Sequence, residues 1–225
     1  MTKMTESTLM NRAEGVTEAI NRSAVSALAV SEPSWLQERR LDAWEVYEGT
    51  AMPTTRLEEW RYTDLSQTLK LETLALSDGP GPEIGDGRYP AQVQRAMDED
   101  WDASGHLVEI DGRVVHTDLN PDLTEKGVIL SSLRDALKSQ PELLQKYLAT
   151  EAVPAEEGKF QALNAALWTD GIFLHVPAGV KLDLPVRVTR WISNPAQAYF
   201  SRALIVADPH SQVSYVDEIL SDDLG

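Results

Sequence analysis

The chain has 225 residues with 36 acidic and 20 basic side chains, a formal charge of −16, and 42% hydrophobic residues. This hydrophobic content excludes wholesale disorder, and the charge argues against broad contact with nucleic acid or anionic lipid. Cysteine is absent, which excludes disulfides, thiolate nucleophiles and cysteine-bound metals. No apolar stretch approaches the ~20 residues of a spanning helix, and the first ten residues lack the apolar core of a secretory signal. We therefore predict a cytoplasmic protein without nucleic-acid or membrane partners.

The basic side chains comprise 7 Lys and 13 Arg, so the acidic surface is poor in lysine. Such a surface is compatible with a high-salt cytoplasm. It is equally compatible with an ordinary acidic protein, because net charge reports on solubility more than on function. Composition leaves both alternatives open.

Residues 1–76 are predicted to form a helical region. Residues 8–30 have apolar side chains at helix-compatible spacing. Ser31 and Pro33 are predicted to start the next helix, Ser31 as the capping residue and Pro33 in the first turn. Gly49 is predicted to end that helix.

Two connecting segments follow. Residues 56–66 carry Trp60 and Tyr62, which are predicted to anchor this connector against the helical region through ring packing. Residues 77–104 begin with a run of glycines and prolines, and we predict that they form a linker and loop.

Residues 105–170 are predicted to mix a hairpin with short helices. Asp111 and Gly112 lie between two apolar runs, which is a strong signal for a two-residue turn whose positions need positive φ. Three helices are predicted at 131–138, 141–148 and 159–168.

The hairpin positions two histidines that could be considered as metal ligands. A tight turn pairs Ile110 with Arg113, and counting outward places His116 opposite Leu107. His106 then lies opposite Thr117, so the two histidines are predicted on opposite faces of the sheet. We therefore predict that they do not share a metal ion.

Residues 171–225 change to a period of two, typical of strands. Comparable apolar runs at 174–176 and 204–206 recur at an offset of roughly 30 residues, which is in the range of solenoid repeats. Short strands separated by Pro and Gly corners fit the coils of a β-helix, and a β-sandwich is the competing interpretation. The fold class predicted for the whole chain is α+β.

Several motifs together resemble the N-terminal part of the SufB/SufD family of iron–sulfur cluster assembly proteins, and the SufD members most closely. Glu-Pro-Ser-Trp-Leu stands at 32–36, Arg-Leu-Asp-Ala-Trp at 40–44 and Glu-Glu-Trp-Arg-Tyr-Thr-Asp-Leu at 58–65. Further along, Leu-Asn-Ala-Ala-Leu-Trp-Thr-Asp-Gly stands at 163–171 and Val-Pro-Ala-Gly-Val at 176–180. Their co-occurrence makes the resemblance specific.

The resemblance implies a helical N-terminal region followed by the start of a right-handed parallel β-helix. It also implies a non-catalytic scaffold subunit that works with a SufB-like paralogue and the SufC ATPase. The cluster would be handled by the complex and not bound by this chain, and a homodimer could form through the β-helix edge. Family members run to roughly twice this length, so we expect the chain to be a fragment whose coils are truncated at 225. A SufB-like role in the same pathway is one alternative.

The other alternative is a carbohydrate-active or carbohydrate-binding β-helix protein. Paired carboxylates would be required for glycoside cleavage, and four acidic side chains of the strand region are the candidates. These are Asp183, Asp208, Asp217 and Glu218. In so acidic a chain a solvated face is the more economical interpretation.

The remaining chemistry-bearing residues are predicted to be structural. His175 and His210 are predicted as surface histidines. The six tryptophans are predicted to pack, with a sugar-stacking platform as the alternative. They are Trp35, Trp44, Trp60, Trp101, Trp168 and Trp191. We predict no catalytic, cofactor-binding or metal-binding residue in this chain.

Overall fold

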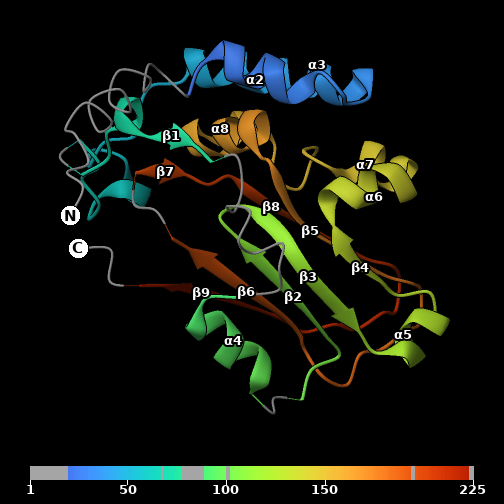
Figure 1. Cartoon of the computed structure of the whole chain (residues 1–225). Coiled ribbons are helices and arrows are strands. Elements are labelled where there is room, and N and C mark those ends of the chain that lie inside the picture. The colour runs from blue at the N-terminus through green and yellow to red at the C-terminus, as the bar shows by residue number, and fades with distance from the viewer. Residues whose placement is uncertain (1–19, 67, 78–88, 100–101, 194–195, 223–225) are drawn as a thin grey trace, which may run out of the picture. The chain divides into compact units, whose positions relative to one another are not determined.

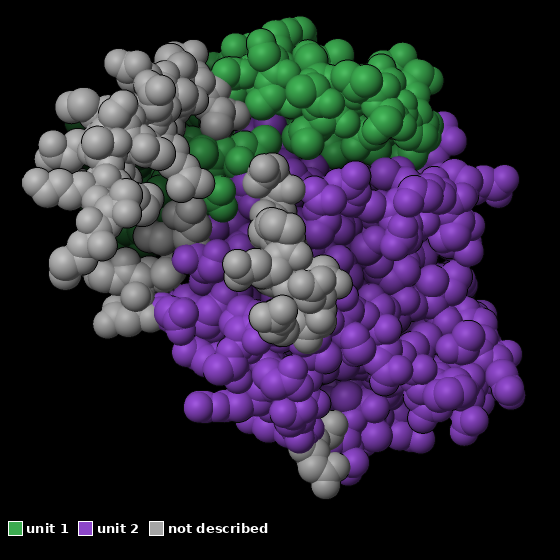
Figure 2. Space-filling view, viewed as in Figure 1, with its two compact units in different colours: residues 1–76, 155–166, 196–198 green, residues 77–154, 167–195, 199–225 purple. Residues whose placement is uncertain are grey.

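The computed structural model describes residues 20–66, 68–77, 89–99, 102–193 and 196–222 (Figure 1). The described residues form a mixed α/β structure with seven α-helices and three small sheets. The chain divides into two compact units, coloured separately in Figure 2. Unit 1 comprises 1–76, 155–166 and 196–198, and unit 2 comprises 77–154, 167–195 and 199–225. No helix in the described ranges is long and apolar enough to cross a membrane.

Unit 1 is mainly helical. Its described elements are α2 (Arg22–Ala29), α3 (Ser34–Gly49), η1 (Glu58–Trp60), η2 (Leu71–Thr73), η4 (Ala155–Glu157), most of α8 (Lys159–Leu167), and the parallel strands β1 (Ala75–Leu76) and β7 (Gln197–Ala198). Helix α3 ends at Gly49 as predicted, but its N-cap is Pro33 and no side chain caps it, so the prediction for Ser31 was wrong. Of the predicted helix at 8–30, the described part is α2, which Asn21 caps by accepting from the Ala24 amide. Residues 8–19 lie outside the described ranges.

A buried ion pair and ring contacts hold unit 1 together. Arg40 is 1% exposed and donates to both carboxylate oxygens of Glu32 at 2.7 Å, and to the Ala166 carbonyl oxygen of α8 at 2.9 Å. Trp60 packs on Phe160, also from α8, with ring centroids 5.5 Å apart. The predicted ring packing is present, but the helix that Trp60 contacts lies outside residues 1–76. Tyr62 is 90% exposed, so the same prediction was wrong for Tyr62.

Within the described residues, unit 2 contains two sheets and four short helices. The first sheet has the order β3-β2-β6-β9 and the second the order β4-β5-β8. The strands are β2 (Gly105–Ile110), β3 (Arg113–Leu119), β4 (Ile129–Ser132), β5 (Asp170–Val176), β6 (Val186–Ile192), β8 (Ser201–Ala207) and β9 (Tyr215–Ser221). The helices are α4 (Ala91–Asp98), α5 (Pro121–Glu125), α6 (Leu133–Ser139) and α7 (Pro141–Tyr147).

Most predicted helices of the middle region are present. Helix α6 is capped by the Ser132 hydroxyl, α7 starts with Pro141 in its first turn, and α8 starts at Lys159. Helix α4 was not predicted, because it lies in the stretch expected to be linker and loop. Its Val93 is buried in a cluster with Val108, Ile110 and Trp191 of the first sheet, so tertiary packing stabilises this helix.

The chain of unit 2 passes twice between the two sheets. It runs from β5 to β6 and then from β8 to β9. Strand β8 pairs in parallel with β5, and β9 pairs in parallel with β6. Asp170 pairs with Ser201 and Val186 with Tyr215, offsets of 31 and 29 residues. These offsets confirm the predicted spacing of roughly 30 residues.

The corners of these two passes also stack through backbone hydrogen bonds. The Gly179 amide donates to the Pro209 carbonyl at 3.1 Å, and the Gln212 amide donates to the Val180 carbonyl at 3.0 Å. The Leu182 amide in turn donates to the Gln212 carbonyl at 2.9 Å. We call 170–192 the first coil and 201–221 the second coil.

The main core of unit 2 lies between its two sheets. Its buried side chains include Leu107, Ile172, Leu174, Val186 and Val188, each with 0% exposure. Burying an aliphatic side chain of this size contributes about 1.5–3 kcal/mol. This cluster therefore supplies the main driving force for stacking the coils.

The hairpin forms as predicted at its turn but not beyond it. Asp111 and Gly112 have φ of 50° and 78°, and Ile110 pairs with Arg113. A β-bulge then shifts the register, so that His116 pairs with Val108 and not with Leu107. One extra residue on β3 moves every later side chain of that strand to the other face. The predicted pairings of both histidines were therefore wrong.

Candidate functional site

Strand β8 forms one edge of its sheet. Among its residues only Val206 is buried, and Ile205 is 39% exposed. Strand β9 is the corresponding edge of the other sheet, where Ile219 is 67% exposed. In the part of the chain that the structure describes, neither strand pairs along its outer edge. Such edges present backbone donors and acceptors that can pair with another strand.

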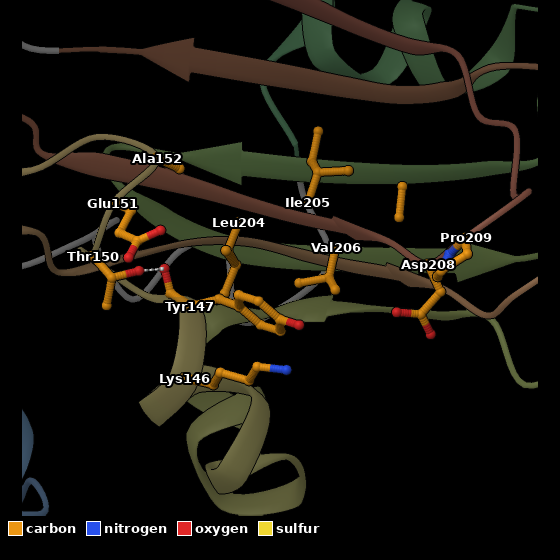
Figure 3. A pocket seen from close by; sticks show the side chains of 11 residues that line it. Lys146, Tyr147, Thr150, Glu151, Ala152, Leu204, Ile205, Val206, Asp208 and Pro209 are labelled. Atoms are coloured by element: carbon orange, nitrogen blue, oxygen red, sulfur yellow. Dashed lines mark hydrogen bonds between the residues drawn. The ribbon is translucent and has the colours of Figure 1, made fainter.

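A groove of about 840 Å³ runs along β8 (Figure 3). One wall is the strand itself with Asp208 and Pro209, and the other is the end of α7 and the loop that follows it. Figure 3 shows the Tyr147 ring reaching from the end of α7 toward Leu204 and Val206. The groove therefore combines an apolar strand edge with a facing aromatic side chain.

The sequence of α7 explains why this wall is presented to the groove. Leu144 and Leu148 are spaced by one helical turn and both are 0% exposed. They bury one side of the segment and leave Lys146 and Tyr147 on the accessible side. Ala149 follows with a φ of 53°, which turns the chain so that the next loop continues the wall.

The charges in the groove are mixed. The Lys146 ammonium lies 4.7 Å from the centroid of the Tyr147 ring. Hydrogen bonding with Tyr147 raises the pKa of Lys146, and the nearby Asp208 carboxylate adds to this effect. Glu151 and Asp208 lie along the same groove. It can thus offer one cation, two carboxylates and an apolar floor to a segment that lies against β8.

His175 lies next to this groove. Its Nε2 is 3.0 Å from the Asp208 carboxylate, and the His175 side chain is 16% exposed, so His175 is only partly at the surface. It links the end of β5 to the corner of the second coil. His210 is exposed, as predicted.

The four acidic candidates are not gathered into one catalytic cluster. Asp217 binds the Arg190 guanidinium at 2.8 and 3.1 Å, and the neighbouring Glu218 binds Arg187 at 2.9 Å. Because Asp217 and Glu218 are adjacent in β9, they point to opposite faces of the sheet. Asp183 is exposed. The arrangement does not favour the paired acids of a glycosidase.

A buried polar network was missed by the sequence reasoning. Glu109 is 4% exposed, accepts from Arg190 at 2.9 Å and also accepts from the Ser201 hydroxyl at 2.5 Å. Arg190 also contacts Ser201. Burial raises the pKa of Glu109 despite the nearby Arg190. The one available signal was a charged residue inside the otherwise apolar run of residues 107–110.

The tryptophans within the described ranges have packing contacts. Those that are at most 4% exposed are Trp44, Trp168 and Trp191. Trp35 lies 4.8 Å from the Arg39 guanidinium, and Trp60 packs on Phe160. Trp101 lies outside the described residues. These positions do not favour a row of exposed rings for stacking sugars.

Stacked coils with an open strand edge are typical of repeat-built proteins that use extended surfaces to bind other chains. Residues 95–188 match the family model described as the SufBD protein N-terminal region. The chain is 31% identical over 212 residues to an iron–sulfur cluster assembly SufBD family protein of Staphylococcus aureus (strain USA300), which covers 90% of this chain and 43% of that protein. It is 31% identical over 194 residues to the iron–sulfur cluster assembly protein SufD of Bacillus subtilis (strain 168), covering 84% and 42%.

These matches confirm the resemblance to the SufB/SufD family over most of the chain. The chain spans less than half the length of these curated relatives.

Proposed function

We propose that this chain acts in iron–sulfur cluster assembly as part of a non-catalytic scaffold subunit. In this proposal it works in the cytoplasm with a SufB-like paralogue and the SufC ATPase, and the cluster is handled by the complex. The observation that carries the proposal is the 31% identity, over 90% of the chain, to proteins named for iron–sulfur cluster assembly. The open strand edges of unit 2 support a role in association.

The fold proposed for the strand region is the start of a right-handed parallel β-helix. Its support is the parallel pairing within both sheets at offsets of 31 and 29 residues, with hydrogen bonds between the corners. A β-sandwich is built mainly from antiparallel pairs. Here β6 pairs in parallel with both β2 and β9, and β5 pairs in parallel with β8. A crystal structure in which the two coils wind right-handedly would support this fold, and a left-handed or sandwich topology would contradict it.

The proposed mode of association is strand addition at the open edges. A parallel strand laid against β8 would form main-chain hydrogen bonds, and its side chains would contact Tyr147 and Ile205 in the groove. Main-chain bonds supply affinity in this mode, while the side-chain contacts select the partner. A charge placed at the exposed edge should oppose such pairing.

The test is co-purification of the tagged chain with the SufB-like paralogue and the SufC ATPase of the same organism. We expect the wild-type chain to elute with the paralogue in size-exclusion chromatography. Ile205→Lys and Ile219→Lys alter side chains that are 39% and 67% exposed, so both variants should fold. We expect each to weaken the association at least about tenfold, because an edge charge is desolvated on pairing.

The matched control is Val30→Lys in unit 1, a position that is 82% exposed and outside both edges. It should co-purify as the wild type does. Failure of the wild-type chain to bind either protein would overturn the proposed function. Undiminished binding by both edge variants would retain association but overturn the role of the edges.

A further inference from the structure

A second pocket, of about 220 Å³, lies on the face of the β3-β2-β6-β9 sheet that α4 covers. Its lining includes His106, His116, Asp118, Glu99 and Arg187. The two imidazole rings are edge-to-face, with centroids 6.4 Å apart. His106 and His116, which a regular hairpin would have placed on opposite faces of the sheet, therefore lie together in this pocket.

The bulge in the hairpin causes this convergence. His106 pairs with Asp118 and Val108 with His116. Directly paired residues share a face, and so do residues two apart on one strand. His106, His116 and Asp118 therefore project from the same face. Without the extra residue in β3, His116 would point into the core between the sheets.

Hydrogen bonding and charge around the pair favour a bound cation. His106 Nε2 lies 2.9 Å from the Thr189 hydroxyl, a contact that orients the ring as outer hydrogen bonds do in metal sites. Three carboxylates and one guanidinium lie around the two histidines. The guanidinium is that of Arg187, which contacts both Glu99 and Glu218, and the third carboxylate is that of Asp118.

The surroundings of His106 act on its pKa in both directions. Burial lowers the pKa of His106, and the positive Arg187 and His116 act in the same direction. Glu218 of β9 and Asp118 of β3 oppose this effect.

We propose that His106 and His116 together bind a divalent first-row transition-metal ion of the Zn²⁺ type, with water completing the coordination. No group of three or more His, Asp or Glu side chains within the described residues is placed to hold a metal ion. The proposed site therefore uses two imidazoles alone as its protein ligands. Imidazole nitrogens suit Zn²⁺, Ni²⁺ and Cu²⁺, whereas Mg²⁺ and Ca²⁺ prefer oxygen. Asp118 adds negative charge nearby. The proposal is independent of the proposed function and departs from the expectation that this chain has no metal-binding residue.

The geometry needs only a small adjustment. Zn²⁺ binds imidazole nitrogen at about 2.0–2.1 Å, so two rings on one tetrahedral ion have centroids roughly 5–6 Å apart. The observed 6.4 Å is longer by roughly 1 Å. His116 lies on β3, the edge strand, and is only partly buried, so side-chain rotation can close this gap.

The test is calorimetric titration of the purified 225-residue chain with Zn²⁺ at pH 7.5. We expect one saturable site that survives excess Mg²⁺. His106→Gln and His116→Gln should each weaken it at least about tenfold, because a second imidazole cannot be replaced by water without loss. The double variant, which retains neither imidazole, should show no saturable binding. The NMR signals of both imidazoles should shift on addition of Zn²⁺.

The matched control is His210→Gln, an exposed histidine at a corner of the second coil, which should leave the affinity unchanged. Since both histidines are partly buried, circular dichroism must show that each variant is folded, and His116→Gln on the edge strand carries the test if His106→Gln is not. Absence of saturable binding by the wild type, or equal affinity of His116→Gln and the wild type, would overturn the site.

Discussion

Strands β5 and β8 are neighbours in one sheet and occupy equivalent positions in successive coils, yet their surroundings differ. Ile172, Phe173, Leu174 and Val176 of β5 are all 0% exposed, whereas only Val206 of β8 is buried. Strand β5 is paired on both sides, with β4 and β8, and β8 is paired only with β5 within the described residues. Similar apolar strands thus serve different purposes, since β5 stabilises the fold and β8 presents an edge.

The largest expected effect is at Gly171 in β5. Its φ is 151°, and a Cβ there would lie 1.9 Å from the Arg202 carbonyl oxygen of β8. Because that obstacle is backbone, Gly171→Ala must push the two coils apart. We expect a loss of more than about 4 kcal/mol in the free energy of unfolding, measured by urea denaturation.

The control for this variant is Gly179→Ala at the corner after β5. Gly179 has a φ of 75°, and a Cβ added there would meet no atom within 4 Å, so only the left-handed backbone is penalised. We expect a loss of about 1–2 kcal/mol. Equal losses in the two variants would contradict the close approach of β5 and β8.

Truncating one isoleucine in each strand measures the difference in burial. Ile172→Ala in β5 removes a side chain that is 0% exposed, and we expect a loss of about 2–5 kcal/mol. Ile205→Ala in β8 removes one that is 39% exposed, and we expect less than about 1 kcal/mol. Thermal and urea unfolding of both variants check this. Similar losses would show that the edge of β8 is covered in solution.

The polar network that joins β8 to the first sheet should respond to pH. Burial raises the pKa of Glu109 above its ordinary value of 4.5, so the folded state holds this proton more tightly than the unfolded state. The Glu109 contribution to stability is therefore full below pH 4.5 and is lost as the pH rises through the raised pKa.

Glu109→Gln removes this titration while keeping a hydrogen-bond acceptor for Ser201. We expect the variant to gain stability relative to the wild type as the pH rises above 4.5. Urea unfolding at a series of pH values measures the difference. A variant that loses stability relative to the wild type over this range would show instead that Arg190 lowers the Glu109 pKa.

The smallest expected effect is at the link between the end of β5 and the second coil. Asp208→Asn retains a hydrogen-bonding partner for His175 but removes the negative charge. Since Asp208 is 36% exposed, solvent screens the pair. We expect a change of about 0–1 kcal/mol in unfolding free energy at neutral pH. A loss of several kcal/mol would show that this pair closes the coil.

The sequence by itself determined the local features of this protein. The two-residue turn at Asp111 and Gly112, the end of α3 at Gly49 and the Pro141 start of α7 depend on backbone preferences of a few residues. The offset of about 30 residues between coils could also be read, because similar apolar runs recur along the chain. The motifs that resemble the SufB/SufD family could likewise be recognised in the sequence alone.

Only the tertiary structure decided which side chains meet. The bulge that places His106 and His116 on one face arises in a sheet where β2 is paired with both β3 and β6. The residue types near the turn do not predict this bulge. The contact of Glu109 with Ser201 joins residues 92 positions apart. Helix α4 depends on the sheet it covers. Register and burial depend on what lies on the other side of a strand, and alternation along one segment does not contain that information.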